Sequence, residues 1–142
     1  MRILGVDFGD RNVGLALSDT LGLTAQPLMT YRLRGGEEDA RFFQDLVKTH
    51  DVSKIVIGLP VRLDGTPGRR SKKTEEFARW LKETLRLPVT FTDERLTTRQ
   101  ALQAMKEQRI RNRERRSVEN QISASLILAS YLESRRKDDH DS

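Results

Sequence analysis

The chain has 142 residues, of which 36% are hydrophobic and 33% are charged. This length predicts one compact domain, and the lack of any run of about eighteen apolar residues excludes a membrane-spanning helix. The sequence contains no cysteine, which excludes disulfides, thiolate nucleophiles and the usual structural zinc sites. Any enzymatic chemistry must therefore come from carboxylates and bound cations, and such ligands favour Mg²⁺ or Mn²⁺.

The net charge of +5 is unevenly distributed along the chain. Residues 69–73 contain four basic side chains, and six more lie between Lys106 and Arg116. Together the two clusters favour a polyanionic partner, because neutralising phosphates releases counterions, although for either cluster alone a solvated loop is the better interpretation. The first ten residues lack the basic and then apolar pattern of a secretion signal, so we expect a cytoplasmic location.

Short apolar segments predict three strands at the start of the chain, over residues 2–7, 13–19 and 26–33. Turn-forming residues separate them, which predicts a three-stranded antiparallel meander. A Gly-Gly break and acidic residues then precede a helix from Glu37 to about His50, in which apolar side chains recur at helical spacing. The histidine at its end fits the carbonyl dipole of the helix better than it fits a catalytic triad.

The second half of the chain alternates strands with helices. Residues 54–61 (KIVIGLPV) contain an uninterrupted apolar run, which is typical of a strand buried on both faces. A loop over residues 60–70 leads to an amphipathic helix that ends before Pro88. The following residues, 88–94 (PVTFTDE), predict a further strand.

Two more helices complete the predicted elements. A capping-box pattern at Thr97 and Gln100 predicts a helix through Met105, and a final amphipathic helix is expected over residues 122–132. A meander followed by alternating helices and strands predicts an α/β domain with one mixed five-stranded sheet flanked by helices. We expect this single domain to cover residues 1–137, followed by a frayed tail at 138–142.

Four segments of the chain resemble one known family. They read GVDFGDRNVGLALSD, VIGLPVRLDGTPG, FTDERLTT and SASLILASYL. Their order and spacing resemble those of the YqgF/RuvX family of RuvC-like proteins, and the resemblance covers nearly the whole chain. It implies a ribonuclease H-like fold, in agreement with the element order. It also implies a nuclease that processes the 5′ end of pre-16S rRNA or resolves Holliday junctions.

The resemblance implies two metal-binding carboxylates. Asp7 matches the ligand at the end of the first strand and Glu94 matches the second, and the two strands could lie side by side in the predicted sheet. Cations held by carboxylates suit phosphodiester cleavage, which needs both a nucleophilic water and a stabilised leaving oxygen. Without the resemblance, Asp7 is equally well interpreted as a turn residue, as is Asp10, and Glu94 as an acidic residue before a helix.

The third carboxylate of the family pattern is missing from its usual place. Aligning ILASYL with the family's ending puts Asn120 there, with Glu119 beside it. An asparagine oxygen can bind a cation but adds no negative charge, so that cation should bind less tightly. Glu119 lies about 100° round a regular helix from Asn120. Asn120 could also be a capping residue after an N-cap at Ser117, so the third ligand stays open.

The remaining candidates are expected to contact a nucleic acid. They lie in the first turn, in the loop and basic cluster after residue 58, and in the segment that follows Glu94. Glycine turns can present backbone N–H groups to an anion, and basic side chains bind phosphates; the alternatives are plain connections and helix caps. The set is Arg11, Asn12 (where the family usually has arginine), Gly58, Pro60, Asp64, Gly65, Arg69, Arg70, Arg95, Thr97, Thr98, Arg111, Arg113 and Arg115.

The leading hypothesis is an endonuclease that depends on Mg²⁺ or Mn²⁺ and acts on structured nucleic acid, with precursor rRNA preferred by the resemblance. One alternative is a Holliday junction resolvase, which needs paired active sites. The other is a non-catalytic binding module, which the missing third carboxylate and the basic loops would suit. We expect a nucleic-acid partner, no membrane, and a monomer or weak homodimer. Aromatic residues are few, so base stacking should not dominate recognition.

Overall fold

The structure is a computed structural model that describes residues 1–59, 69–93 and 115–141. Within these ranges, five strands form one mixed sheet in the order β3-β2-β1-β4-β5. The strands β1 (Arg2–Phe8), β2 (Asn12–Ser18) and β3 (Ala25–Arg32) form an antiparallel meander. The strands β4 (Val52–Leu59) and β5 (Val89–Asp93) extend the sheet in parallel with β1. The predicted mixed five-stranded sheet is therefore confirmed.

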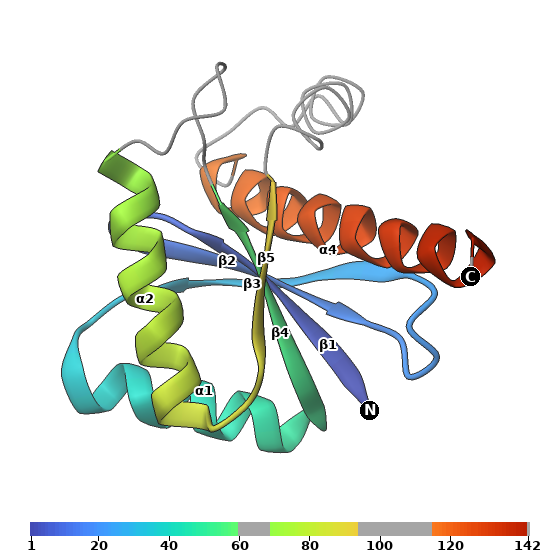
Figure 1. Cartoon of the computed structure of the whole chain (residues 1–142). Coiled ribbons are helices and arrows are strands. Elements are labelled where there is room, and N and C mark those ends of the chain that lie inside the picture. Colours follow the sequence, from blue (N-terminus) through green and yellow to red (C-terminus); the bar gives the residue numbers. More distant parts are fainter. Residues whose placement is uncertain (60–68, 94–114, 142) are drawn as a thin grey trace.

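The described helices cover both faces of this sheet (Figure 1). Helices α1 (Gly36–Thr49) and α2 (Arg69–Leu85) lie on one face, and α4 (Arg115–Asp141) crosses the other. None of the described helices combines the length and the hydrophobicity needed to cross a membrane.

The last helix, α4, differs from its prediction at both ends. It begins at Arg115 rather than near residue 122, so Ser117 lies inside the helix and is not its N-cap. The interpretation of Asn120 as a capping residue is therefore wrong. The helix also includes residues 138–141, for which the sequence predicted a frayed tail. The division of the chain into one domain and a tail remains a prediction.

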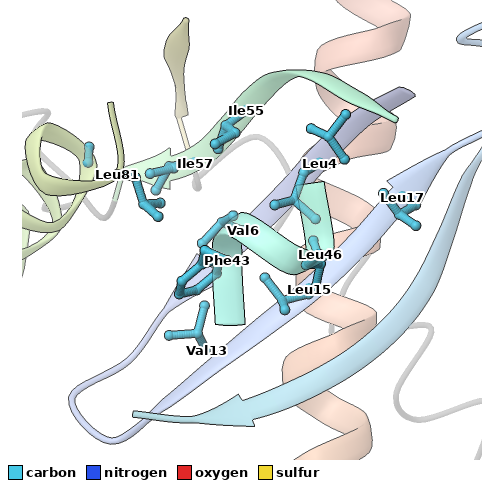
Figure 2. Packing of buried hydrophobic residues seen from close by; sticks show 12 residues of the cluster. Leu4, Val6, Val13, Leu15, Leu17, Phe43, Leu46, Ile55, Ile57 and Leu81 are labelled. Atoms are coloured by element: carbon cyan, nitrogen blue, oxygen red, sulfur yellow. The ribbon is translucent and has the colours of Figure 1, made fainter. Parts of the chain in front are cut away.

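Alternation along the strands divides the apolar side chains between two clusters. On one face, strand side chains such as Leu4 and Val6 pack around Phe43 of α1 and Leu81 of α2 (Figure 2). On the other face, Ile3, Ala16 and Val56 pack against Ala124, Ile127 and Leu128 of α4. The two clusters bury opposite faces of the same strands, as a sheet covered on both sides requires.

Three glycines allow α4 to approach the sheet closely. A methyl group at Gly5 would lie 2.8 Å from Leu128 Cβ and 2.9 Å from the Ala124 carbonyl oxygen. A methyl group at Gly58 would lie 2.5 Å from Ile127 Cδ1, and one at Gly14 would overlap the backbone of Asn120. Because these separations leave no room for a side chain on the strands, the helix backbone rests directly on Gly5 and Gly14, and the Ile127 side chain rests on Gly58.

The start of α1 is fixed by a buried carboxylate. Asp39 accepts hydrogen bonds from the Tyr31 hydroxyl (2.7 Å), the Arg34 amide (3.0 Å) and the Gly35 amide (2.9 Å). Burial alone raises the pKa of Asp39, but these hydrogen bonds outweigh it and hold the pKa below its ordinary value. Burial, together with the contact to Asp39, raises the pKa of Tyr31 to about 12. This network ties β3 to the first turn of α1.

We expect Gly5→Ala to destabilise the protein by about 1–3 kcal/mol, because the added methyl group meets a helix backbone oxygen that cannot turn away. Gly58→Ala on the same face is the matched control. Gly58→Ala should lower the free energy of unfolding less than Gly5→Ala does, since Ile127 Cδ1 is the end of a flexible side chain that can move. Urea unfolding of both variants measures the free energies of unfolding. Equal losses would contradict the close-packing argument.

The Tyr31 hydroxyl should make stability depend on pH in the alkaline range. Its pKa is about 12 in the folded chain and about 10 in an unfolded chain. The stability that it contributes is therefore complete below pH of about 10 and is lost as the pH rises towards 12. We expect the stability difference between wild type and Tyr31→Phe to shrink over that interval, as measured by urea unfolding. A difference that does not change with pH would contradict this expectation.

Candidate active site

The carboxyl ends of the parallel strands β1, β4 and β5 meet at one edge of the sheet. Asp7 is half-buried near the end of β1, Gly58 lies near the end of β4, and Thr92 near the end of β5. Val6 pairs with Ile57, so the same register places Asp7 beside Gly58, and Gly58 pairs with Thr92. Asp7, Gly58 and Thr92 therefore form one row across the end of the sheet.

Strand alternation places the side chain of Asp7 on the α4 face. Ile3 belongs to the apolar cluster against α4, and Gly5 contacts Ala124 and Leu128 of that helix. Because side chains two positions apart share a face, Asp7 follows Ile3 and Gly5 on this side of β1.

Asn120 lies next to Asp7 although the two residues are far apart in sequence. Asp7 pairs directly with Gly14 in the antiparallel ladder of β1 and β2, and paired Cα atoms lie about 4.5–5.5 Å apart. Above Gly14 lies Asn120, whose Cβ would be 3.0 Å from a methyl group built on that glycine. Asn120 therefore packs over the strand position that pairs with Asp7. The structure thus brings together two of the three predicted metal ligands.

This pair offers oxygen ligands of the kind that hard divalent cations prefer. Among the described residues, no group of three His, Cys, Asp or Glu side chains could hold a metal ion. Glu94 lies outside the described residues, and Glu119 precedes Asn120 in α4. The described residues therefore supply a carboxylate and an amide for a candidate metal site, and their role as ligands remains a prediction, as does that of Glu94.

The structure gives Asp7 and Asp10 different surroundings, although the sequence alone allowed both to be turn residues. Asp10 lies in the turn between β1 and β2, where the Gly9 amide donates a hydrogen bond to the Asn12 carbonyl oxygen (3.0 Å). Its exposed carboxylate pairs with Lys73 Nζ of α2 at 3.6 Å. Asp10 is therefore engaged with α2, on the opposite side of the sheet from Asn120.

The predicted substrate-binding residues are only partly covered by the structure. Arg11 is exposed in the turn after β1, Asn12 is exposed at the start of β2, and Gly58 belongs to the row described above. Arg69 and Arg70 begin α2, and Arg115 begins α4. The others lie outside the described residues and stay predictions: Pro60, Asp64, Gly65, Arg95, Thr97, Thr98, Arg111 and Arg113.

Two residues of this site were not singled out from the sequence. Gly14 separates Asp7 from Asn120, and Thr92 extends the row of side-chain positions onto β5. A glycine inside a predicted strand is a signal for close approach of another backbone, and that signal was present at Gly14. Nothing local in the sequence indicates Thr92, because its place follows from the register of two parallel strands.

Residues 1–134 of the chain match the family described as "RuvX: Holliday junction resolvase". The chain belongs to the RuvX family. A relative from Syntrophus aciditrophicus (strain SB), named "Putative pre-16S rRNA nuclease", is 47% identical over 133 residues, covering 94% of this chain and 89% of the relative. The family resemblance expected from the sequence motifs is therefore confirmed.

Two solved structures resemble this RuvX family member over nearly its whole length. RuvC of T. thermophilus in complex with a Holliday junction substrate has a TM-score of 0.57 at 11% identity, covering 96% of each chain. The fowlpox virus resolvase, in complex with Holliday junction DNA, has a TM-score of 0.58 at 13% identity, covering 94% of this chain and 98% of the resolvase. These likenesses confirm the predicted ribonuclease H-like fold.

Proposed function

We propose that this RuvX protein is a divalent-metal-dependent endonuclease that processes the 5′ end of pre-16S rRNA. Its family membership and the nuclease name of its relatives support the reaction class. The observation that carries the proposal for the site is the position of Asn120 beside Asp7, across Gly14.

The cation is held by Asp7, Glu94 and Asn120, with Glu119 as the alternative to Asn120. The donor set fits Mg²⁺ or Mn²⁺, because carboxylate and amide oxygens are hard ligands. Glu94 directly follows the last residue of β5 in sequence, and its role as the second carboxylate is what the family resemblance implies. A cation bound there would supply Lewis-acid stabilisation of the charge that develops on the phosphate.

The basic residues of the chain hold the substrate by its phosphates. Arg11 is exposed in the turn next to Asp7, at the carboxyl edge of the sheet. Arg69, Arg70 and Arg115 begin the helices on either side of the sheet, and the basic segment before α4 adds further positive charge. Phosphate contacts of this kind position a nucleic acid without reading its sequence, and the binding weakens with salt. We place the protein in the cytoplasm, as a monomer or weak homodimer.

Holliday junction resolution is the second candidate function. The description of the matching family names this activity, and two resolvases share the fold. Symmetric cutting of a junction requires two active sites related by a two-fold axis. A stable homodimer of this chain would therefore favour resolution over rRNA processing.

Cleavage of two labelled substrates tests the proposal. The substrates are a precursor rRNA 5′ region and a synthetic four-way junction, each with Mg²⁺ or Mn²⁺. We expect Asp7→Asn to slow cleavage about 100-fold or more, because metal assistance contributes several kcal/mol to such reactions. Asp45→Asn, which removes an exposed carboxylate of α1, is the matched control and should cleave normally.

The outcome for the two substrates decides between the candidate functions. Preferred cutting of the precursor rRNA supports processing, and preferred cutting of the junction supports resolution instead. No cutting of either substrate, with salt-sensitive binding intact, would contradict the nuclease and favour the non-catalytic binding module.

Replacing the amide of Asn120 by a carboxylate should tighten metal binding. We expect Asn120→Asp to lower the Kd for Mn²⁺ by about fivefold or more, since one added charge near a cation contributes at least about 1 kcal/mol. Calorimetric titration with Mn²⁺ measures this change.

Two further variants control this titration. Gln44→Glu adds the same charge on the exposed surface of α1 and should leave the Kd for Mn²⁺ unchanged. Combining Asp7→Asn with Asn120→Asp should cancel the gain. If the gain survived without the Asp7 carboxylate, the two residues would not share a cation.

A further inference from the structure

A pocket of about 490 Å³ opens on the sheet face opposite the candidate active site. It lies between the end of β1 and helices α1 and α2. Six of the residues that line it carry the argument: Phe8, Asp10, Lys73, Glu76, Phe77 and Trp80. Phe8 directly follows Asp7 in β1, so the two side chains point to opposite faces of the same strand end. Only strand β1 therefore lies between the pocket and the position of Asp7 in the candidate active site.

Three aromatic rings form one wall of this pocket. The rings of Phe8 and Phe77 are stacked with centroids 4.5 Å apart, and those of Phe77 and Trp80 with centroids 5.7 Å apart. All three side chains are only half-buried, although Phe77 and Trp80 recur at a spacing typical of core residues of a helix. A wall of this kind suits a flat ligand, because every nucleobase has a face that can stack on an aromatic ring.

The charged groups of the pocket differ in their availability. Asp10 and Lys73 pair with each other at 3.6 Å. Both oxygens of Asp39 are occupied by the hydrogen bonds at the start of α1. The Glu76 carboxylate is exposed and forms no ion pair or hydrogen bond with any described side chain. Among the carboxylates that line the pocket, Glu76 is thus the one without a partner in the part of the chain that the structure describes.

The chemistry of Glu76 selects among flat ligands. An ionised carboxylate only accepts hydrogen bonds, so it pairs best with two donors side by side. Guanine presents its N1–H and 2-amino group in that arrangement, whereas adenine and cytosine present a donor next to an acceptor on the same edge. An arginine side chain would also offer two donors, so it is the competing ligand that the test must separate from guanine. Lys73, which also lines the pocket, is the cation available for the phosphate of a nucleotide. The exposed Asp10–Lys73 pair holds Lys73 only weakly.

We propose that this pocket binds one unpaired guanine of the nucleic-acid substrate, with Glu76 on its Watson–Crick edge, the aromatic wall on its face and Lys73 on its phosphate. The inference rests on the proposed function and deepens it, because it makes an unpaired guanosine beside the cleavage site a feature of the substrate. Stacking of a single base is compatible with recognition that otherwise depends on phosphates.

The only tryptophan of the chain provides a direct test. Trp80 lines the pocket, so its single indole N–H signal in a ¹⁵N–¹H correlation spectrum reports occupancy. The titrations use guanosine 5′-monophosphate, adenosine 5′-monophosphate, ribose 5-phosphate and arginine amide, all without divalent cations so that the candidate active site does not contribute. We expect a saturable shift with the guanosine nucleotide, and binding of the adenosine nucleotide about tenfold weaker.

Two adjacent glutamates of α2 give a matched pair of variants. Glu76→Gln should remove most of the preference for guanosine over adenosine, because the amide offers one acceptor in place of two. Glu75→Gln should keep the preference, since the exposed Glu75 side chain lies outside this pocket. Both substitutions are on the surface of the same helix, so neither should prevent folding.

Several results would overturn the inference. A shift with arginine amide but not with guanosine nucleotide would indicate a pocket for basic peptides. Equal shifts with ribose 5-phosphate and the guanosine nucleotide would show phosphate binding at Lys73 without base recognition, and the absence of any shift would show that the pocket binds none of these ligands. Cleavage is not part of this test, so a nuclease with an unresponsive Trp80 signal would refute the pocket alone. A guanosine-dependent shift in a chain that cuts nothing would refute the nuclease alone.

Discussion

The direct packing of α4 on a glycine-lined face of the sheet is the interaction on which the candidate site depends. Gly5 and Gly14 let the backbone of α4 lie directly on the strands, and Gly58 leaves room for the Ile127 side chain. At Gly14 this close approach puts Asn120 next to the strand position that pairs with Asp7. A larger residue there would move the helix outward and separate the amide from the carboxylate. The catalytic proposal is thus a consequence of helix-to-sheet distance as much as of residue type.

Strand alternation gives the end of β1 two different roles. Asp7 faces α4 and the polar pair, whereas Phe8 faces α2 and the aromatic pocket. The sheet between them is one strand layer thick, so a nucleic acid that passes over its carboxyl edge could reach both sides. The turn that carries Arg11 lies at this edge. Phosphate contacts, metal ligands and a base pocket can therefore act on one short stretch of substrate.

The strands and the mixed sheet could be predicted because they depend on local patterns and on a family resemblance. The expectation that the strand of Asp7 lies beside the strand before Glu94 was wrong, because β4 lies between β1 and β5. The start of α4 could not be predicted, because Ser117 is a good N-cap in sequence, and a cap contributes only about 1 kcal/mol. Packing of a whole helix face against the sheet outweighs that preference. The contact between Gly14 and Asn120 joins distant segments, so no local pattern reports it. Phe77 and Trp80 have core spacing, and only the three-dimensional arrangement shows that a pocket exposes them.

Helix α4 has two roles, and these determine how substitutions on the two faces of the sheet affect stability and activity. The helix buries one side of the sheet through Ala124, Ile127 and Leu128, and it also carries Asn120. Repacking between the sheet and α1 can alter stability without shifting this helix. Repacking beneath α4 changes its height and rotation on the strands, and so moves a candidate ligand. Substitutions between the sheet and α1 should therefore change stability without changing activity, whereas substitutions beneath α4 should change both.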